Sequence, residues 1–174
     1  MSNYKANLHK IKAFIFDFDG VMTDGSVWTT DNKEFIRCGN VKDGYALQYA
    51  VKKGYKVAII SGGSAPNIKH RMETLGITDV FLACNKKIDT YHQYLKENNL
   101  SNDEILYMGD DIPDYEIMME AGVPTCPADA VAEIKEIAHY ISHLGGGKGC
   151  VRDVIEQVMR LHQKWFCSTE SVHW

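Results

Sequence analysis

Five short, largely apolar segments spaced along the chain constrain its fold more than any other feature. They cover residues 11–16, 56–60, 79–82, 105–108 and 123–126. Each has the length of a strand, and its continuous apolar run is typical of a strand that is buried on both faces of a sheet. The segments therefore predict a sheet that helices cover on both sides.

The stretches between these segments carry helical patterns. Residues 43–53 and 66–75 are each followed by a glycine, and residues 87–98 place apolar side chains at helical intervals. A final amphipathic helix is expected over residues 151–166. Strands that alternate with helices of about ten residues define βαβ units, so we expect an α/β fold with a doubly wound, Rossmann-like parallel sheet. Ligands of such sheets bind at the carboxyl ends of the strands.

The stretch between the first strand and the first helix predicts a β-hairpin over about residues 26–38, because SVWTT and EFIRC flank the turn sequence DNK. This hairpin is a candidate flap beyond the active edge of the sheet. The length of 174 residues suits a single domain. We expect that domain at residues 1–166 and a loose tail at residues 167–174.

Charge and cysteine content exclude several classes of protein. A net charge of −4 and a pI near 6.0 provide no basic excess to neutralise a run of phosphates, so we expect no nucleic-acid partner. The five cysteines form no C-x-x-C pair, which fits neither a disulfide framework nor a zinc ribbon and favours a reducing compartment. The first apolar run is interrupted by Asp17, so we expect no signal peptide, no membrane contact and a cytoplasmic location.

Two carboxylates, Asp17 and Asp19, follow the first predicted strand in the sequence F-D-F-D-G-V. Carboxylates this close at the end of a buried strand repel each other unless a cation or a proton compensates. A solvated turn with an acidic cap explains the same pattern equally well. The pair is therefore a candidate catalytic or metal-binding element that needs support from other residues.

The second predicted core strand ends in Ser61, Gly62 and Gly63. A hydroxyl group followed by glycines leaves backbone N–H groups free to bind an oxyanion. The same three residues are also ordinary turn formers. We treat them as a candidate phosphate-binding turn.

Three carboxylates, Asp110, Asp111 and Asp114, come directly after the fourth predicted strand. Such clustering is costly unless the group binds a hard divalent ion, and Mg²⁺ binds through one or two carboxylates together with water and phosphate oxygens. The cluster predicts a Mg²⁺ site. Lys86 and Lys87 precede it at the start of a predicted helix, where a cation opposes the helix dipole. Lys87 is the inward-facing candidate because it adjoins the buried helical pattern, while Lys86 remains possible.

Together these residues supply the components of phosphoryl transfer through an aspartyl-phosphate: a nucleophile, an acid/base, phosphoryl-binding groups, a lysine and a Mg²⁺ site. Their order along the chain, D-x-D, Ser, Lys and then G-D-D-x-x-D, resembles that of the haloacid dehalogenase superfamily of phosphatases. The resemblance extends over about residues 12–154, nearly the whole chain.

Within that superfamily the chain resembles the capless branch that contains the 3-deoxy-D-manno-octulosonate 8-phosphate phosphatases. Four segments carry this resemblance: FDFDGVMTDG, NVKDGY, RMETLGI and GGKGCVRD. It implies that Asp17 is the nucleophile, Asp19 the general acid/base, and Ser61 and Lys87 the phosphoryl clamp. It also implies Mg²⁺ ligands at Asp17, Asp110 and the Asp19 carbonyl, with Asp111 and Asp114 supporting them. The substrate-binding positions it implies are Asn40, Lys42, Asp43, Gly62, Arg71, Lys148 and Arg152.

The same resemblance implies a substrate and an assembly. The substrate would be a phosphorylated 2-keto-3-deoxy sugar acid of eight carbons, as in lipopolysaccharide biosynthesis. Only about 35 residues separate Asp19 from the next core strand, too few for a cap domain. The family covers its site by forming a homotetramer through the hairpins, so Lys148 and Arg152 are candidate contacts to a substrate carboxylate in a neighbouring subunit.

Departures from the family pattern leave alternatives open. Gly63 and Gln48 stand where many relatives carry arginine, so two substrate-facing cations are missing. Relatives that act on nine-carbon sugar acids have glutamate at the Gly63 position, which this chain also lacks. A phosphoacceptor signalling domain uses similar residues, but its lysine comes last along the chain, whereas Lys87 here precedes the acidic cluster.

Overall fold

The computed structural model describes residues 4–32, 34–64 and 66–166, and its core is one six-stranded sheet. The strands lie in the order β5-β4-β1-β6-β7-β8, and every neighbouring pair is parallel. Their bounds are β1 Ala13–Phe16, β4 Lys56–Ile60, β5 Asp79–Phe81, β6 Ile105–Met108, β7 Val123–Cys126 and β8 Tyr140–Ile141. The predicted α/β class and parallel sheet are confirmed.

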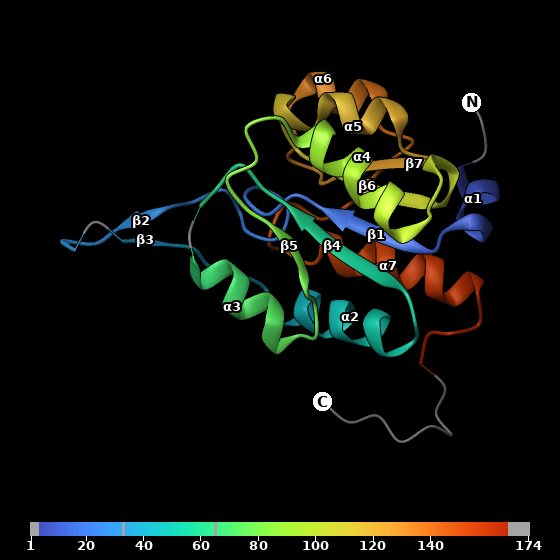
Figure 1. The fold of residues 1–174 in the computed structure, drawn as a ribbon, viewed down its shortest axis with the longest axis horizontal. Coiled ribbons are helices and arrows are strands. Elements are labelled where there is room, and N and C mark those ends of the chain that lie inside the picture. Colours follow the sequence, from blue (N-terminus) through green and yellow to red (C-terminus); the bar gives the residue numbers. More distant parts are fainter. Residues whose placement is uncertain (1–3, 33, 65, 167–174) are drawn as a thin grey trace.

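The central strands are buried because helices cover both faces of the sheet, as Figure 1 shows. One layer contains α2 (Val41–Lys52), α3 (Pro66–Thr74) and α7 (Cys150–Leu161), with α1 (Tyr4–Asn7) and the 3₁₀ turn η1 (Leu8–Lys10) beside them. The other layer contains α4 (Lys87–Asn98), α5 (Tyr115–Glu120) and α6 (Ala132–Ile137). Two further 3₁₀ turns, η2 (Asn102–Glu104) and η3 (Ile112–Asp114), flank β6.

Alternate residues of the central strands supply two separate cores. Phe14 and Phe16 of β1 pack in the core under α2 and α7, whereas Ala13 and Ile15 pack under α4 and α5. This two-sided burial explains the continuous apolar runs in the sequence. The expectation of burial on both faces was wrong for β5, which is only half-buried because it forms an edge of the sheet.

The predicted hairpin is present but has a short ladder. Strands β2 (Trp28–Thr29) and β3 (Phe35–Ile36) are antiparallel, with Trp28 opposite Ile36 and Thr29 opposite Phe35. The hairpin projects from the end of the sheet at which β1 ends (Figure 1). Between β1 and β4 the described chain forms only this hairpin and α2, so it contains no cap domain there.

The predicted final helix over residues 151–166 was too long, because α7 ends at Leu161. His162 then ties the chain to the core: its Nδ1 atom lies 2.5 Å from the Tyr55 hydroxyl, and its Nε2 atom lies 3.0 Å from the Leu8 carbonyl oxygen. The chain turns back and buries Trp165 edge-on against Tyr49. The predicted tail at residues 167–174 lies outside the described residues.

Two further expectations concern membranes and cysteines. Among the described helices, none combines the length and the apolar character that crossing a membrane requires. The thiols of Cys38, Cys84, Cys126 and Cys150 are all free. The fifth cysteine lies outside the described residues.

Candidate active site

The candidate catalytic residues meet at the carboxyl ends of β4, β1 and β6. The chain runs from β1 to β4 and β5 on one side of β1 and then crosses to β6, β7 and β8 on the other side, and such a switch point is where doubly wound sheets bind ligands. A cavity of about 860 Å³ opens there. It is lined by eight of the residues that the sequence singled out: Asp17, Asp19, Ser61, Gly62, Lys87, Asp110, Asp111 and Asp114.

Asp17 and Lys87 form a buried ion pair at the base of this cavity. The Lys87 Nζ atom lies 2.8 Å from Asp17 Oδ1 and 2.7 Å from Asp114 Oδ1, and all three side chains are buried. Burial lowers the pKa of Lys87, but the two carboxylates outweigh this effect and raise it above its ordinary value. The lysine therefore stays charged. Lys86 also lines the cavity, but it is exposed and pairs with Asp89, so Lys87 is the one that binds the two site carboxylates.

The Asp114 carboxylate is held in place by three hydrogen-bond donors. It accepts hydrogen bonds from Lys87, from the Tyr107 hydroxyl at 2.6 Å and from the Asp110 backbone N–H at 3.2 Å. Gly109 leaves room for it, because a Cβ atom there would lie 2.4 Å from the Asp114 Cβ atom. Asp111, by contrast, is exposed and caps η3 by accepting from the Ile112 N–H.

The turn after β4 surrounds Ser61, which is buried. The Ser61 Oγ atom accepts a hydrogen bond from the Gly63 N–H at 3.1 Å. The Ser61 N–H donates to the Phe81 carbonyl, and its own carbonyl accepts from the Cys84 N–H. These bonds fix the position of Ser61, which lines the same cavity as Asp17 and Asp19.

Asp19 is paired with an arginine that the sequence gave no reason to single out. Arg37, at the base of the hairpin, donates from Nε to Asp19 Oδ1 at 2.5 Å and from Nη2 to Asp19 Oδ2 at 3.0 Å. The two residues are 18 positions apart in the sequence. No local sequence pattern indicates that an arginine in the hairpin contacts the turn after β1. Tyr107 was also missed, since it lies inside an apolar strand where its hydroxyl gives no signal.

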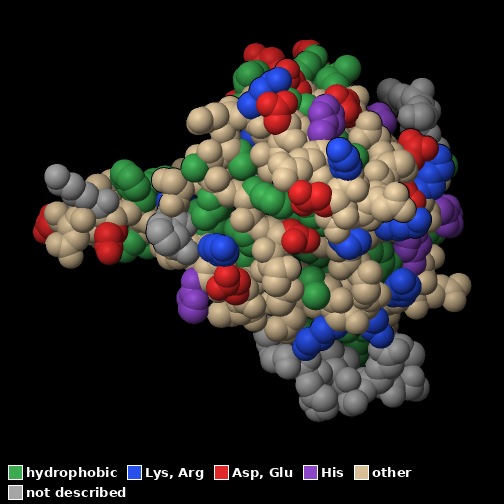
Figure 2. Space-filling model, in the orientation of Figure 1, with side chains coloured by type: hydrophobic (Ala, Val, Ile, Leu, Met, Phe, Trp, Pro, Cys, Tyr) green, Lys and Arg blue, Asp and Glu red, His purple; other side chains and the backbone are tan. Residues whose placement is uncertain are grey.

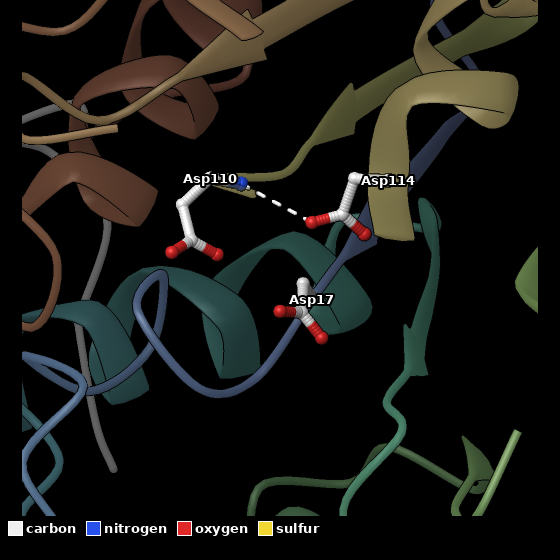
Figure 3. A group of neighbouring side chains, drawn as sticks. All are labelled: Asp17, Asp110 and Asp114. Atoms are coloured by element: carbon white, nitrogen blue, oxygen red, sulfur yellow. Dashed lines mark hydrogen bonds between the residues drawn. The ribbon is translucent and has the colours of Figure 1, made fainter. Parts of the chain in front are cut away.

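Three carboxylates of the site converge as ligands of a cation would. Oxygen atoms of Asp17, Asp110 and Asp114 all lie within 4.8 Å of one another, and Figure 3 shows the three side chains around a common centre. Gly20 makes this approach possible, because a Cβ atom there would lie 2.1 Å from Asp110 Oδ2. The sequence had placed Asp114 only in support of the ligands. The predicted contribution of the Asp19 carbonyl stays a prediction.

The electrostatics of this carboxylate group fit a divalent cation. Burial and the Asp114 carboxylate raise the pKa of Asp17 to about 8, although Lys87 opposes the shift. Burial, Asp114 and Asp111 raise the pKa of Asp110 to about 7. The Asp110 Oδ1 atom is buried and has no hydrogen-bond partner among the described residues. Hard oxygen ligands with excess negative charge and an unsatisfied atom are the donor set that Mg²⁺ prefers.

Stability should therefore depend on pH and Mg²⁺ together. Because the folded-state pKa values of Asp17 and Asp110 are raised, the metal-free protein binds more protons than the unfolded chain, and its stability falls as pH rises from about 4 through 7 and 8. Mg²⁺ favours the ionised carboxylates, so the rise in melting temperature that Mg²⁺ causes should be larger at pH 8 than at pH 5. Melting curves in chelator and in Mg²⁺ measure this difference.

The matched variant for that measurement is Asp110→Asn, which should lose most of the Mg²⁺ effect at pH 8. Asp43 also has a raised pKa, of about 6, owing mainly to burial. The readout is therefore the rise in melting temperature that Mg²⁺ causes at each pH, because the pH dependence of stability alone also includes Asp43. A gain from Mg²⁺ that is equal at both pH values in the wild-type protein would contradict the assignment of these carboxylates.

The remaining predicted substrate-binding residues lie outside the cavity in this chain. Asn40 and Arg71 line a second cavity next to it, and Lys42, Lys148 and Arg152 line a third beside α7. Asp43 is fully buried, and its Oδ1 atom accepts from the Arg152 N–H at 2.7 Å, which caps the first turn of α7. Asn40 likewise caps α2 by accepting from the Lys42 N–H.

Comparison with known proteins defines the class. A sequence profile of the haloacid dehalogenase-like hydrolases matches residues 28–128. The chain belongs to this family of hydrolases, and the relatives that resemble it over most of their length make it a phosphatase.

The similar curated proteins include phosphatases of one particular kind. The chain is 33% identical to 3-deoxy-D-manno-octulosonate 8-phosphate phosphatase KdsC of Yersinia pestis over 154 residues, which are 88% of this chain and 82% of that protein. It is 32% identical to KdsC of Escherichia coli K12, with the same coverage of both chains.

Solved structures agree with these sequence similarities. The crystal structure of 3-deoxy-D-manno-octulosonate 8-phosphate phosphatase from Yersinia pestis has a TM-score of 0.91 at 31% identity and covers 94% of this chain and 88% of its own. The enzyme from Moraxella catarrhalis, solved with a magnesium ion, a phosphate ion and a KDO molecule, has a TM-score of 0.88 at 28% identity. It covers 92% of each chain.

Proposed function

We propose that this phosphatase hydrolyses 3-deoxy-D-manno-octulosonate 8-phosphate with Mg²⁺ as its cofactor. The single observation that carries the reaction is the position of Lys87 between Asp17 and Asp114, beside Asp110, at the switch point of the sheet. The eight-carbon substrate is supported by the names of the relatives and by the ligands of the Moraxella catarrhalis enzyme.

The residues divide the work of phosphoryl transfer among them. Asp17 attacks the phosphorus atom, and the Ser61 hydroxyl and the Lys87 ammonium bind the phosphoryl oxygens while the charge on them changes. Asp19 gives a proton to the departing sugar oxygen and then takes one from the water that hydrolyses the aspartyl-phosphate. Backbone N–H groups near Gly62 complete the phosphate-binding turn.

Asp17, Asp110 and Asp114 would hold the Mg²⁺ ion, with the Asp19 carbonyl as a further proposed ligand. When bound, Mg²⁺ offsets the charge of the phosphate and of the buried carboxylates. Lys87 contributes a second positive charge through its contacts with Asp17 and Asp114. Asp111 supports this loop through its cap on η3.

The assembly we propose is a homotetramer in which the C-terminal segment of one subunit completes the site of a neighbour. Its support is the hairpin, where Trp28, Phe35 and Ile36 are exposed by 70%, 53% and 49%. Figure 2 shows apolar side chains along this projection, which apolar surface of another subunit would cover. Lys148 and Arg152 lie outside the cavity of their own chain, as residues that act on a neighbouring subunit would. We also propose a cytoplasmic location and a single domain over residues 1–166.

A panel of phosphate esters tests the proposed substrate. The specificity constant kcat/KM should be highest for 3-deoxy-D-manno-octulosonate 8-phosphate, lower for a nine-carbon sugar acid 9-phosphate, and lower still for hexose phosphates and a generic aryl phosphate. If the eight-carbon acid is no better than hexose phosphates, the substrate assignment is wrong while the reaction class survives. Repeated turnover of the aryl phosphate with Mg²⁺ also separates a phosphatase from a one-shot phosphoacceptor domain.

A further inference from the structure

Asp19 is the most exposed of the four proposed catalytic side chains. Its side chain is 32% exposed, whereas Asp17, Ser61 and Lys87 are buried. Packing alone therefore does not set the direction in which the Asp19 carboxylate points. A group that gives a proton to the leaving oxygen must lie within hydrogen-bond reach of that oxygen, so Asp19 needs another residue to orient it.

Arg37 orients Asp19 in this structure. Its Nε atom donates to Asp19 Oδ1 at 2.5 Å, and its Nη2 atom donates to Asp19 Oδ2 at 3.0 Å. Two parallel hydrogen bonds from a planar guanidinium group fix both the position and the orientation of a carboxylate, which a single contact does not.

Arg37 is itself held in place. Its side chain is only 12% exposed, and it lines the second cavity together with the apolar side chains of Phe18, Met22 and Met72. It follows β3 directly, so the pairing of β2 with β3 sets the course of the backbone that carries it. A largely buried arginine therefore supports a partly exposed acid.

The two oxygen atoms of Asp19 have different surroundings. A Cβ atom at Gly63 would lie 3.2 Å from Asp19 Oδ2, 3.4 Å from Ser61 Oγ and 3.5 Å from Arg37 Nη2. Because Gly63 has no side chain, this point beside the phosphate-binding turn stays open, and Oδ2 borders it. Oδ1 accepts the shorter bond, from Nε, so the longer bond between Nη2 and Oδ2 is the one that a substrate oxygen would replace.

We propose that Arg37 is a positioning residue for the acid/base step, which anchors Asp19 through Oδ1 and leaves Oδ2 to meet the reacting oxygen. This inference rests on the proposed function, because it requires Asp19 to act as acid and base. In the first step Oδ2 gives its proton to the sugar oxygen while the bond from that oxygen to phosphorus breaks and the bond from Asp17 forms. In the second step Oδ2 takes a proton from water while the water oxygen attacks phosphorus and the bond to Asp17 breaks. Arg37 exchanges no proton in either step.

The test compares two substrates whose leaving groups differ in their need for a proton. One is the sugar phosphate that the protein hydrolyses best, and the other is dinitrophenyl phosphate, whose leaving group needs no proton. Since kcat/KM covers the steps up to the aspartyl-phosphate, Arg37→Gln should lower it by about tenfold to a hundredfold for the sugar phosphate and by less than about threefold for the dinitrophenyl ester. For the dinitrophenyl ester kcat and KM should fall together, because hydrolysis of the intermediate still needs Asp19 as its base.

Three further variants isolate the role of Arg37. Arg37→Lys keeps the charge but lacks the planar fork, so it should show a smaller loss with the same dependence on the leaving group. In an Asp19→Asn background, Arg37→Gln should change kcat/KM for the sugar phosphate by less than about twofold, because Arg37 acts through Asp19. The matched control is Arg160→Gln, an exposed arginine that pairs with Glu156 on α7, and it should keep the wild-type values.

Equal losses for both substrates, or a further loss in the double variant, would overturn the proposal, because Arg37 would then act on the phosphate or on the fold. Wild-type kinetics in Arg37→Gln would overturn it as well. If Arg37→Gln does not fold, Arg37→Lys carries the test, and its loss must be confined to the sugar phosphate. If Asp19→Asn keeps the wild-type kcat/KM for the sugar phosphate, the proposed role of Asp19 is wrong, and the role of Arg37 fails with it.

Discussion

Asp17→Asn should lower kcat by about four orders of magnitude or more, as is typical when a covalent nucleophile is removed. The amide is a poor nucleophile and cannot carry the phosphoryl group. Steady-state turnover of an aryl phosphate at saturating Mg²⁺ measures this loss. The aryl phosphate is the appropriate substrate because its leaving group needs little help from Asp19, so the rate reports on Asp17.

The same variant should keep its fold, which separates lost chemistry from lost structure. Burial and the Asp114 carboxylate raise the pKa of Asp17 to about 8, so its buried charge is costly, and an asparagine of nearly the same size avoids that cost while it loses the ion pair with Lys87. The melting temperature of Asp17→Asn in chelator should therefore stay close to that of the wild-type protein. Asp103→Asn is the matched control, since this exposed carboxylate pairs with Lys10 and does not line the catalytic cavity. Comparable losses in both variants would remove Asp17 from its assigned role.

Lys87→Ala should lower kcat/KM by at least about a hundredfold, because the loss of one charged stabiliser costs about 3 kcal/mol of barrier. The ammonium group reaches Asp17 at 2.8 Å and is the buried cation nearest to the nucleophile. Lys86→Ala is the matched control. Its side chain is 62% exposed and pairs with Asp89 at 3.2 Å, so its removal should change the rate less than about twofold. Near-normal activity in Lys87→Ala would transfer the role to Lys86.

Lys87→Ala should also destabilise the metal-free protein. It leaves Asp17 and Asp114 buried beside each other without their shared cation, and breaking a buried ion pair costs about 3–5 kcal/mol. Mg²⁺ should restore part of this loss, because it replaces some of the missing positive charge. Thermal melts with and without Mg²⁺ therefore accompany the kinetic assay. If activity stays low after Mg²⁺ has restored the melting temperature, the loss comes from the missing ammonium group in the reaction and not from unfolding.

Much of the site could be predicted because its residues follow strand ends. Asp17, Ser61 and Asp110 each come directly or almost directly after an apolar run, and parallel topology brings those ends to one edge. The apolar period of the helix favoured Lys87 but left Lys86 open, and in the structure Lys87 is the buried one. Local signals were sufficient wherever function coincided with a strand or helix end.

Interactions between distant segments could not be predicted in the same way. The Asp19–Arg37 pair forms because the hairpin returns Arg37 to the turn after β1. The hairpin has only two residue pairs and a turn, and its sequence does not reveal the direction in which it projects. Helices α5 and α6 are only six residues long, too short for a clear apolar period, and they went unpredicted. Asp43 is a buried cap of α7 in this chain, a contact between residues 109 positions apart that no local pattern reveals.

The most direct test of the account is to find the phosphoryl group on the protein during turnover. Asp19→Asn, supplied with Mg²⁺ and an aryl phosphate, should accumulate the covalent intermediate, because the leaving group departs without the acid while hydrolysis lacks its base. After acid quenching, borohydride reduction of the acyl phosphate and peptide mapping, the account predicts modification at Asp17. Modification at another residue, or rapid turnover through Asp17→Asn with no covalent phosphate at any time point, would contradict it.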